Sequence, residues 1–151
     1  MAEFTRNALQ TVQPNNPVLL DTVIGCNKGY VYHRPGSGIV TLRGVANNPC
    51  ARFARYKVFF KGNIALSEGA TVGPISVAVT IDGEPDVVST SISTPTAVGD
   101  FNVAVAVGEY DVPIGCCWNI AVENVLAPSA TATTAPAIDV QNAVLTVNRT
   151  A

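Results

Sequence analysis

The hydrophobic residues of this 151-residue chain alternate with a period of two rather than 3.6. The alternation is clearest in four runs rich in Val, Ile and Thr: ISVAVTI (75–81), FNVAVAV (101–107), CWNIAVENV (117–125) and NAVLTV (142–147). β-Branched residues suit a pleated surface and disfavour helices. No stretch carries an apolar stripe at helical spacing. The chain is therefore predicted to be all-β.

Turn residues divide the chain into short strands, because ten prolines and twelve glycines interrupt the runs. The expected strands cover residues 8–13, 18–24, 29–33, 38–43, 52–66, 75–81, 86–93, 100–110, 115–125 and 138–148. Three hairpins are expected, with turns at RPGS (34–37), at Asp82-Gly83 and at EYDVPIG (109–115). About ten strands with turns every 8–12 residues or so predict a two-sheet antiparallel jelly-roll sandwich.

The length suits a single domain over residues 1–151, with the Ala/Thr/Pro-rich stretch 126–137 as an exposed loop. No apolar run is long enough for a membrane helix, and the first residues lack the apolar core of a secretory signal. We therefore expect synthesis in a reducing cytosol and free thiols at all four cysteines. The cysteines are Cys26, Cys50, Cys116 and Cys117. A Cys26–Cys50 bridge is the alternative in oxidising surroundings.

The composition favours self-association. Hydrophobic residues make up 48% of the chain and charged residues only 13%, whereas soluble domains carry about 25% charged residues. A lone subunit with so few charges is poorly solubilised. We infer that copies of the same chain cover part of its surface.

Charged residues are segregated along the sequence. Seven basic residues and no acidic one fall between Lys28 and Lys61, and nine acidic residues and no basic one fall between Glu68 and Asp139. If strands from the two segments interleave, these charges scatter over the folded surface. Alternatively, a basic face of one subunit meets an acidic face of the next and fixes its orientation. The net charge of −2 gives no general attraction to nucleic acid.

Six segments share their order and character with a known group of jelly rolls. They are PVLLDTV (17–23), GYVYHRPGSGIVTLRG (29–44), ARFARYKVFFKGNIAL (51–66), VGPISVAVTIDGEP (72–85), CCWNIAVENV (116–125) and AVLTVNRTA (143–151). Their arrangement resembles the tumour-necrosis-factor-like superfamily. The likeness is greatest to small bacterial and bacteriophage members and to the C-terminal domains of collagen-like exosporium glycoproteins. This chain has no Gly-X-Y collagen tract, so a free-standing trimer or one part of a larger particle is expected.

The resemblance implies a homotrimer around a three-fold axis, and alternation along RFARYKVFF (52–60) indicates which strand face meets it. One face, the more apolar, is assigned to the sandwich core; it comprises Arg52, Ala54, Tyr56, Val58 and Phe60. The other mixes cations with aromatic rings and is assigned to the subunit interface. The interface candidates are Phe53, Arg55, Lys57, Phe59, Tyr30 and Tyr32.

No set of residues points to catalysis, a metal ion or a cofactor. His33 is the only histidine, which leaves too few ligands for a histidine metal site, and it is expected to face solvent beside the RPGS turn. Asp82, Glu84 and Asp86 lack the spacing of a calcium loop. The carboxylates Glu109 and Asp111 are interpreted as solvated charges near a turn rather than as a glycosidase pair. Trp118 is assigned to the core in preference to a sugar-stacking platform.

The function expected from these observations is a non-enzymatic structural or binding module. The leading interpretation is a homotrimeric accessory protein of a bacteriophage virion, such as a head or tail decoration or a fibre tip. Its partners would be its own copies, other virion proteins and host surface glycans, but neither nucleic acid nor membrane. The alternative is an adhesion domain on a bacterial cell or spore surface.

Overall fold

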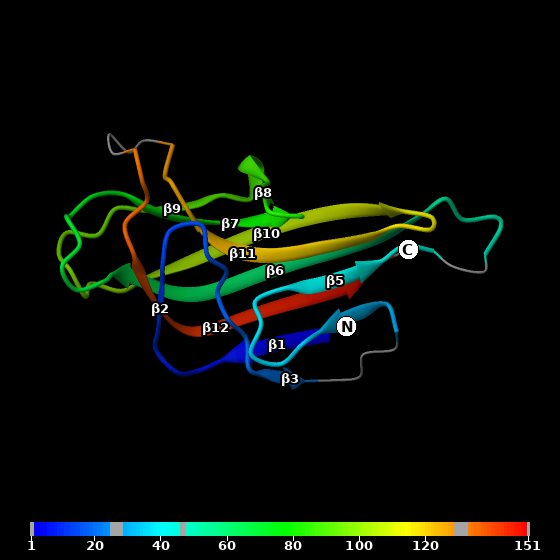
Figure 1. Ribbon diagram of the computed structural model, residues 1–151, viewed down its shortest axis with the longest axis horizontal. Helices are drawn as coiled ribbons and strands as arrows, with labels where there is room; N and C mark the ends of the chain where they lie inside the picture. Colours follow the sequence, from blue (N-terminus) through cyan, green and yellow to red (C-terminus); the bar gives the residue numbers. More distant parts are fainter. Residues whose placement is uncertain (1, 25–28, 46–47, 129–132, 151) are drawn as a thin grey trace.

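The computed structural model describes residues 2–24, 29–45, 48–128 and 133–150 (Figure 1). Within these residues twelve strands and one short 3-10 helix are found. They are β1 (Ala2–Arg6), β2 (Gln10–Val12), β3 (Thr22–Ile24), β4 (Val31–His33), β5 (Val40–Arg43), β6 (Phe53–Leu66), β7 (Ile75–Ile81), β8 (Glu84–Pro85), η1 (Val87–Ser89), β9 (Ser91–Ser93), β10 (Asn102–Pro113), β11 (Cys117–Val125) and β12 (Ile138–Arg149). The all-β jelly-roll prediction is confirmed.

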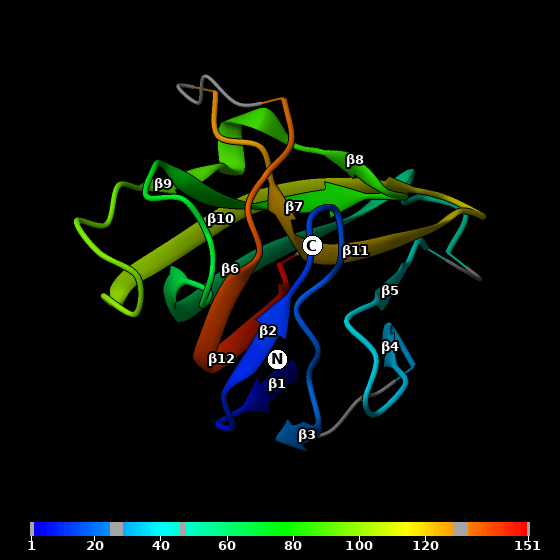
Figure 2. The same ribbon diagram turned by 60° about the vertical axis from the view of Figure 1, so that its left-hand side comes forward.

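The strands form two six-stranded sheets in which every pairing is antiparallel. Sheet A has the order β10-β6-β12-β1-β3, and β2 also pairs with β12. Sheet B has the order β4-β5-β11-β7-β8, and β9 also pairs with β7. The edge strands β3 and β4 belong to different sheets and lie on the same side of the sandwich (Figure 2).

The core lies between the sheets and is filled by one face of each long strand. Along β6 the buried residues include Ala54, Tyr56, Val58 and Phe60, so the predicted core face of this strand is confirmed. Arg52, which precedes the strand, is exposed. Full burial of an aromatic side chain such as that of Phe60 stabilises the fold by roughly 1.5–3 kcal/mol.

Most expected strands are present, and their ends differ by a few residues. The main omission is β1, which holds only two inward apolar residues, Ala2 and Phe4. It is stabilised by pairing with β12, a partner more than a hundred residues away that local periodicity does not indicate. The expected strand 86–93 is replaced at its start by η1, and only its last residues, in β9, pair with β7.

The predicted pairing of 100–110 with 115–125 is wrong. Strand β10 pairs with β6 in sheet A, whereas β11 pairs with β5 and β7 in sheet B. The turn between β10 and β11 therefore carries the chain from one sheet to the other instead of closing a hairpin (Figure 1). A short turn between two alternating runs has the same sequence character in both cases. The other two expected hairpins, β4–β5 and β7–β8, are confirmed.

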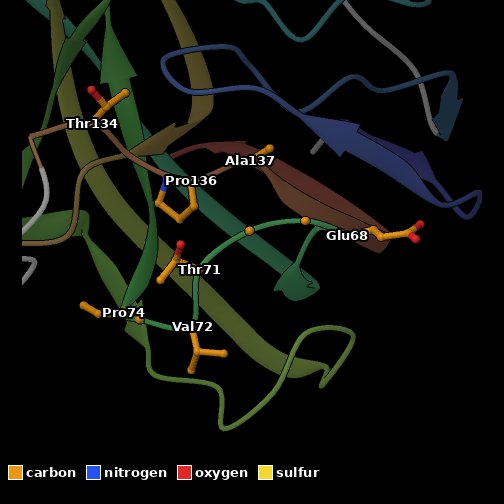
Figure 3. A pocket seen from close by; sticks show the side chains of 10 residues that line it. Glu68, Thr71, Val72, Pro74, Thr134, Pro136 and Ala137 are labelled. Carbon is orange, nitrogen blue, oxygen red and sulfur yellow. The ribbon is translucent and has the colours of Figure 1, made fainter.

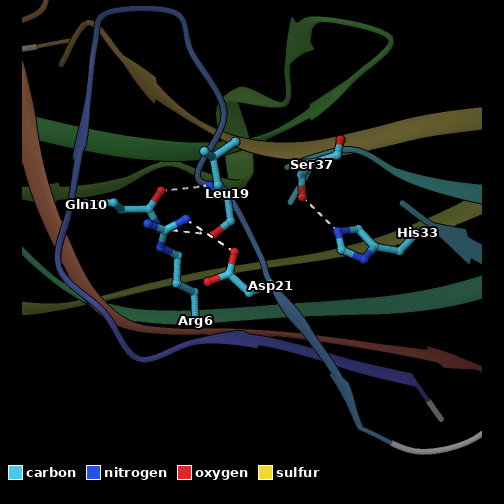
Figure 4. A network of polar contacts seen from close by, with 6 residues as sticks. All are labelled: Arg6, Gln10, Leu19, Asp21, His33 and Ser37. Atoms are coloured by element: carbon cyan, nitrogen blue, oxygen red, sulfur yellow. Dashed lines mark hydrogen bonds and ion pairs between the residues drawn. The ribbon is translucent and has the colours of Figure 1, made fainter. Parts of the chain in front are cut away.

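The prediction that His33 faces solvent is also wrong, because only 6% of the residue is exposed. Its ring packs against Phe4 with the ring centroids 4.7 Å apart. His33 Nε2 lies 2.7 Å from the carbonyl oxygen of Ser37, which can only accept, so Nε2 is the protonated nitrogen (Figure 4). The alternation of β4, with Val31 and His33 inward and Tyr32 outward, places the ring under the hairpin.

Gly44 is required where the turn between the sheets meets the end of β5. A Cβ at this position would overlap the carbonyl oxygen of Pro113 and lie 2.9 Å from that of Cys116. We expect Gly44→Ala to lower the free energy of unfolding by about 1–3 kcal/mol, since backbone atoms must move to accept the methyl group. Urea denaturation measures this change.

The matched control is Gly73→Ala. A Cβ at Gly73 meets nothing within 4 Å, and the residue does not have a positive φ. Its stability should stay the same or rise slightly. Equal urea midpoints for the two variants would contradict this account of the turn.

Candidate self-association surface

The first half of strand β10 turns its larger residues outward and its small residues inward, whereas Tyr110 and Val112 in the second half are buried. Ala104 and Ala106 are fully buried, whereas Val103, Val105 and Val107 are 60%, 40% and 53% exposed. A strand of a lone sandwich normally buries its larger apolar residues. The inverted pattern of β10 therefore leaves three valine side chains in water in a single subunit.

The register of sheet A surrounds these valines with further apolar groups. Val107 lies opposite Phe59 on β6, and Phe59 lies opposite Thr146 on β12. In the neighbouring row, Val105 lies opposite Lys61, and Lys61 opposite Val144. We call the outward surface formed by these strands the apolar face; its members are Phe59, Val103, Val105, Val107 and Val144.

One end of the apolar face is bordered by charged residues that pair within the chain. Arg55 Nε donates to Asp111 Oδ1 at 2.7 Å, and Arg55 Nη2 donates to Asp111 Oδ2 at 2.9 Å. Glu109 Oε1 lies 3.5 Å from Arg55 Nε and is opposite Lys57 in the register. Here the basic and acidic segments of the sequence are brought together as adjacent strands of one subunit, as the interleaving interpretation expects.

This pairing shifts the ionisation of its members. The hydrogen bonds and charge of Arg55 lower the pKa of the Asp111 carboxyl group, and those of Asp111 raise the pKa of Arg55. Both side chains are about 40% exposed, with values of 40% and 42%. Solvent therefore screens the pair, and it orients the two strands more than it stabilises them.

Four of the six predicted interface residues share the outer surface of sheet A. Phe53, Arg55, Lys57 and Phe59 all point away from the core, and the Arg55 guanidinium lies 5.2 Å from the centre of the Phe53 ring. The two tyrosines lie elsewhere. Tyr32 is on the outer surface of β4 in sheet B, and Tyr30 precedes β4.

Tyr30 stacks on a residue from the other sheet. The Arg149 guanidinium at the end of β12 lies 4.1 Å from the centre of the Tyr30 ring. The hydroxyl of buried Tyr56 donates toward the carbonyl oxygens of Tyr30 and Arg43. Burial raises the pKa of Tyr56. Tyr30 therefore lies at an end of the sandwich, away from the centre of the apolar face.

The three valines of β10 were not identified as interface residues from the sequence. The signal was present in FNVAVAV (101–107), where small and β-branched residues alternate. The period alone does not tell which set faces inward. The neighbouring strand β6 determines which set faces inward. Ala106 lies opposite the large Phe60 ring, and small residues beside large ones fill a core evenly.

The residues considered for chemistry have structural partners. Tyr110 OH donates to Asp86 Oδ2 at 2.7 Å, and the backbone N–H of Asn119 donates to Asp82 Oδ1 at 3.1 Å. In the described part of the chain, no three His, Cys, Asp or Glu side chains converge as a metal site would require. Trp118 is partly buried and packs against the core.

The cysteines that the structure describes are free and exposed; they are Cys50, Cys116 and Cys117. Cys26, and with it the possible Cys26–Cys50 bridge, lies outside the described residues. The free state of the three described thiols matches the expectation. Nowhere in the described ranges is there a helix of the length and hydrophobicity needed to cross a bilayer.

A groove of about 480 Å³ opens beside the connection between β6 and β7 (Figure 3). It lies between the connection 68–74 and residues 134, 136 and 137 of the Ala/Thr/Pro-rich segment. The side chain of Glu68 points away from its centre, which Thr71, Val72 and Pro136 surround (Figure 3). Ala127 and Ala135, on either side of this segment's middle, are buried. These groups offer hydroxyls and apolar contacts but no nucleophile–base pair.

A polar cluster on the N-terminal side serves the fold (Figure 4). The amide of Gln10 replaces a strand partner for Leu19, donating to its carbonyl oxygen at 3.0 Å and accepting from its N–H at 2.9 Å. Arg6 Nη1 donates to Asp21 Oδ1 at 3.3 Å. These bonds fasten the irregular segment between β2 and β3 to sheet A.

No family model matches the sequence, and no curated protein matches it. Solved structures do match the fold. One is Eiger TNF from S. frugiperda, with a TM-score of 0.62 and 12% sequence identity over 100% of this chain and 92% of that one. Another is the globular domain of zebrafish complement 1qA protein, with a TM-score of 0.51 and 11% identity over 94% and 93% of the two chains. This chain has the TNF/C1q-like jelly-roll fold.

The TNF/C1q-like jelly roll confirms the tumour-necrosis-factor-like architecture that the sequence indicated. In this chain the outward surfaces of the two sheets differ in character. The outer surface of sheet A is long and carries the apolar face. On β7 of sheet B, the residues that alternate with the core residues are small and are also buried; they are Ser76, Ala78 and Thr80. Sheet A is therefore the stronger candidate for contact with another protein.

Proposed function

We propose that this chain is a non-enzymatic, homotrimeric structural and binding module whose subunits bury the apolar face against one another. The observation that carries the proposal is the inverted pattern in residues 103–107 of β10, where the two alanines are buried and the three valines exposed. Exposed apolar side chains gathered on one surface are typical of interaction sites. The TNF/C1q-like fold supports the trimer, because the resemblance implies assembly around a three-fold axis.

Self-association also accounts for the composition. Only 13% of the residues are charged, and the centre of the apolar face holds Lys61 as its one charged side chain between Val105 and Val144. Cyclic assembly gives every subunit the same protection from water. A different protein that covered the apolar face would have to bind every subunit separately.

The proposal of a non-enzymatic role is supported by the use of the ionisable groups. His33 is packed on Phe4, Asp86 binds Tyr110, and Asp111 binds Arg55. Each of these groups orients or fastens a strand. A binding role therefore accounts for them without a reacting molecule.

The finer proposal is that the module belongs to a bacteriophage virion, as a head or tail decoration or a fibre tip that attaches to host surface glycans. The free and exposed thiols of Cys50, Cys116 and Cys117 support assembly in a reducing cytosol rather than during secretion. A domain on a bacterial cell or spore surface is the alternative, and exposed thiols favour it less because they oxidise there.

Sedimentation velocity tests the trimer. We expect a species of three times 15.7 kDa at micromolar concentration. Val107→Asp should shift it to the monomer, since a carboxylate buried in an apolar contact is strongly unfavourable. The matched control is Val72→Asp, because Val72 and Val107 are both 53% exposed and Val72 lies in the β6–β7 connection. The proposal fails if wild type is monomeric or if the two variants associate equally.

The location is tested by mass spectrometry of virions purified from a lysed culture of the producing cells. Peptides of this chain should be found in the virion fraction in a constant ratio to the major capsid protein. Recovery only with cell or spore surfaces would favour the adhesion domain and reject the virion.

A further inference from the structure

We infer that Val87 and Val88 form a preformed apolar knob that inserts into the apolar face of the neighbouring subunit. This inference rests on the proposed trimer and names the contact that forms it. The two valines lie in η1, the short 3-10 turn beside β8 at the edge of the sandwich (Figures 1 and 2). Neither residue was assigned a role from the sequence.

The knob is unusually exposed. Val88 is 94% exposed and Val87 73%, the two highest values among the large hydrophobic residues that the structure describes. A loop is free to place polar residues at such positions. Two adjacent valines at the tip of a turn therefore indicate contact with an apolar surface.

The turn that carries the knob is held by a dense set of hydrogen bonds. The backbone N–H of Asp86 donates to the carbonyl oxygen of Val79 at 2.8 Å, and Asp86 Oδ1 accepts from the N–H of Val88 at 3.3 Å. Buried Ser89 donates through Oγ to the carbonyl oxygen of Asp86 at 2.7 Å and accepts from the N–H of Val79 at 2.9 Å. The valines are thus fixed before any partner arrives, which reduces the entropy lost on binding.

The same segment is fastened to the free edge of β10. Tyr110 OH donates to Asp86 Oδ2 at 2.7 Å, and Ser91 Oγ accepts from the N–H of Val105 at 3.3 Å. Gly108 leaves the space that the Tyr110 hydroxyl occupies, because a Cβ there would overlap it. Burial and the bond to Asp86 raise the pKa of Tyr110, so it remains a donor. The turn that carries the knob is therefore held rigidly at the edge of sheet A.

The occupant that fits the knob is a second copy of this chain. The apolar face offers aliphatic and aromatic side chains, and Lys61 is the one charged residue at its centre. The knob is flanked by Glu84, which is exposed. No ion pair joins either Lys61 or Glu84 to another described residue. Opposite charges beside two matching apolar surfaces favour their contact.

The knob and the face occupy different parts of one subunit. A contact between them is therefore head-to-tail, and such contacts close into rings when the rotation permits. This is the arrangement that a trimer needs, because each subunit gives its knob to one neighbour and receives that of the other. The contact also covers the valines of β10 that the fold leaves exposed.

The first test is the double substitution V87T/V88T, which keeps the shape of both side chains and adds a hydroxyl to each. Sedimentation velocity should show trimer formation weakened by at least about tenfold, as expected of central contacts. The control Val72→Thr should associate like wild type. Asp86, Ser89 and Tyr110 are unchanged in the double variant, and circular dichroism should show an unaltered fold.

The second test locates the contact. A photo-reactive benzoylphenylalanine at position 88 should cross-link between subunits to peptides of β6 or β10. Cross-links confined to other peptides, or unweakened association of V87T/V88T while wild type is a trimer, would overturn the knob and leave the proposed function standing. A monomeric wild-type protein would instead remove the proposed function itself.

Discussion

The register between β6 and β10 is the constraint on which the rest of the structure depends. The two strands pair without interruption from Asn102 opposite Ile64 to Pro113 opposite Phe53. Successive side chains of a strand point to opposite faces, so a slip by one residue would exchange the two sets. The rings of Tyr56 and Phe60 fix the choice, because they can be buried only on the face where β10 places Tyr110 and Ala106.

This packing of the core also determines which residues of β10 face solvent. With Ala104 and Ala106 inside, the outward residues of β10 on sheet A are three valines, two carboxylates and Pro113. The carboxylates are matched by Arg55 and Lys57 on β6. The valines lie opposite Asn63, Lys61 and Phe59 of the same strand. The surface is thus divided into a charged end that is complementary within the subunit and an apolar part that is not. The same edge strand holds η1 through Asp86 and Ser91, which connects the core, the apolar face and the valine knob.

The sequence predicted those features that follow from alternation within one strand. The division of β6 into a core face with Tyr56 and Phe60 and an outer face with Phe53 and Phe59 needed no partner strand, and the structure confirms it. The DG hairpin was likewise local, since Asp82 and Gly83 both have the positive φ that its turn requires.

The remaining features depend on residues distant in the chain. The turn after β10 crosses between sheets because of its packing with Gly44, and His33 is buried because Phe4 of β1 covers it. Alternation in FNVAVAV predicted a strand but not its inward face, which the ring of Phe60 selects. In the sequence, Val87 and Val88 are typical of a strand. In the structure they lie in a 3-10 turn that the hydrogen bonds of Asp86 and Ser89 stabilise. Their exposure is a property of the three-dimensional arrangement.

The central claim is that the outer surface of sheet A is covered in solution, and hydroxyl-radical footprinting of Phe59 tests it most directly. Phe59 is 43% exposed in the isolated subunit. At micromolar concentration its oxidation in wild type should be several-fold slower than in Val107→Asp. Equal oxidation rates of Phe59 in the two proteins would show that this surface stays in water, and would contradict the account.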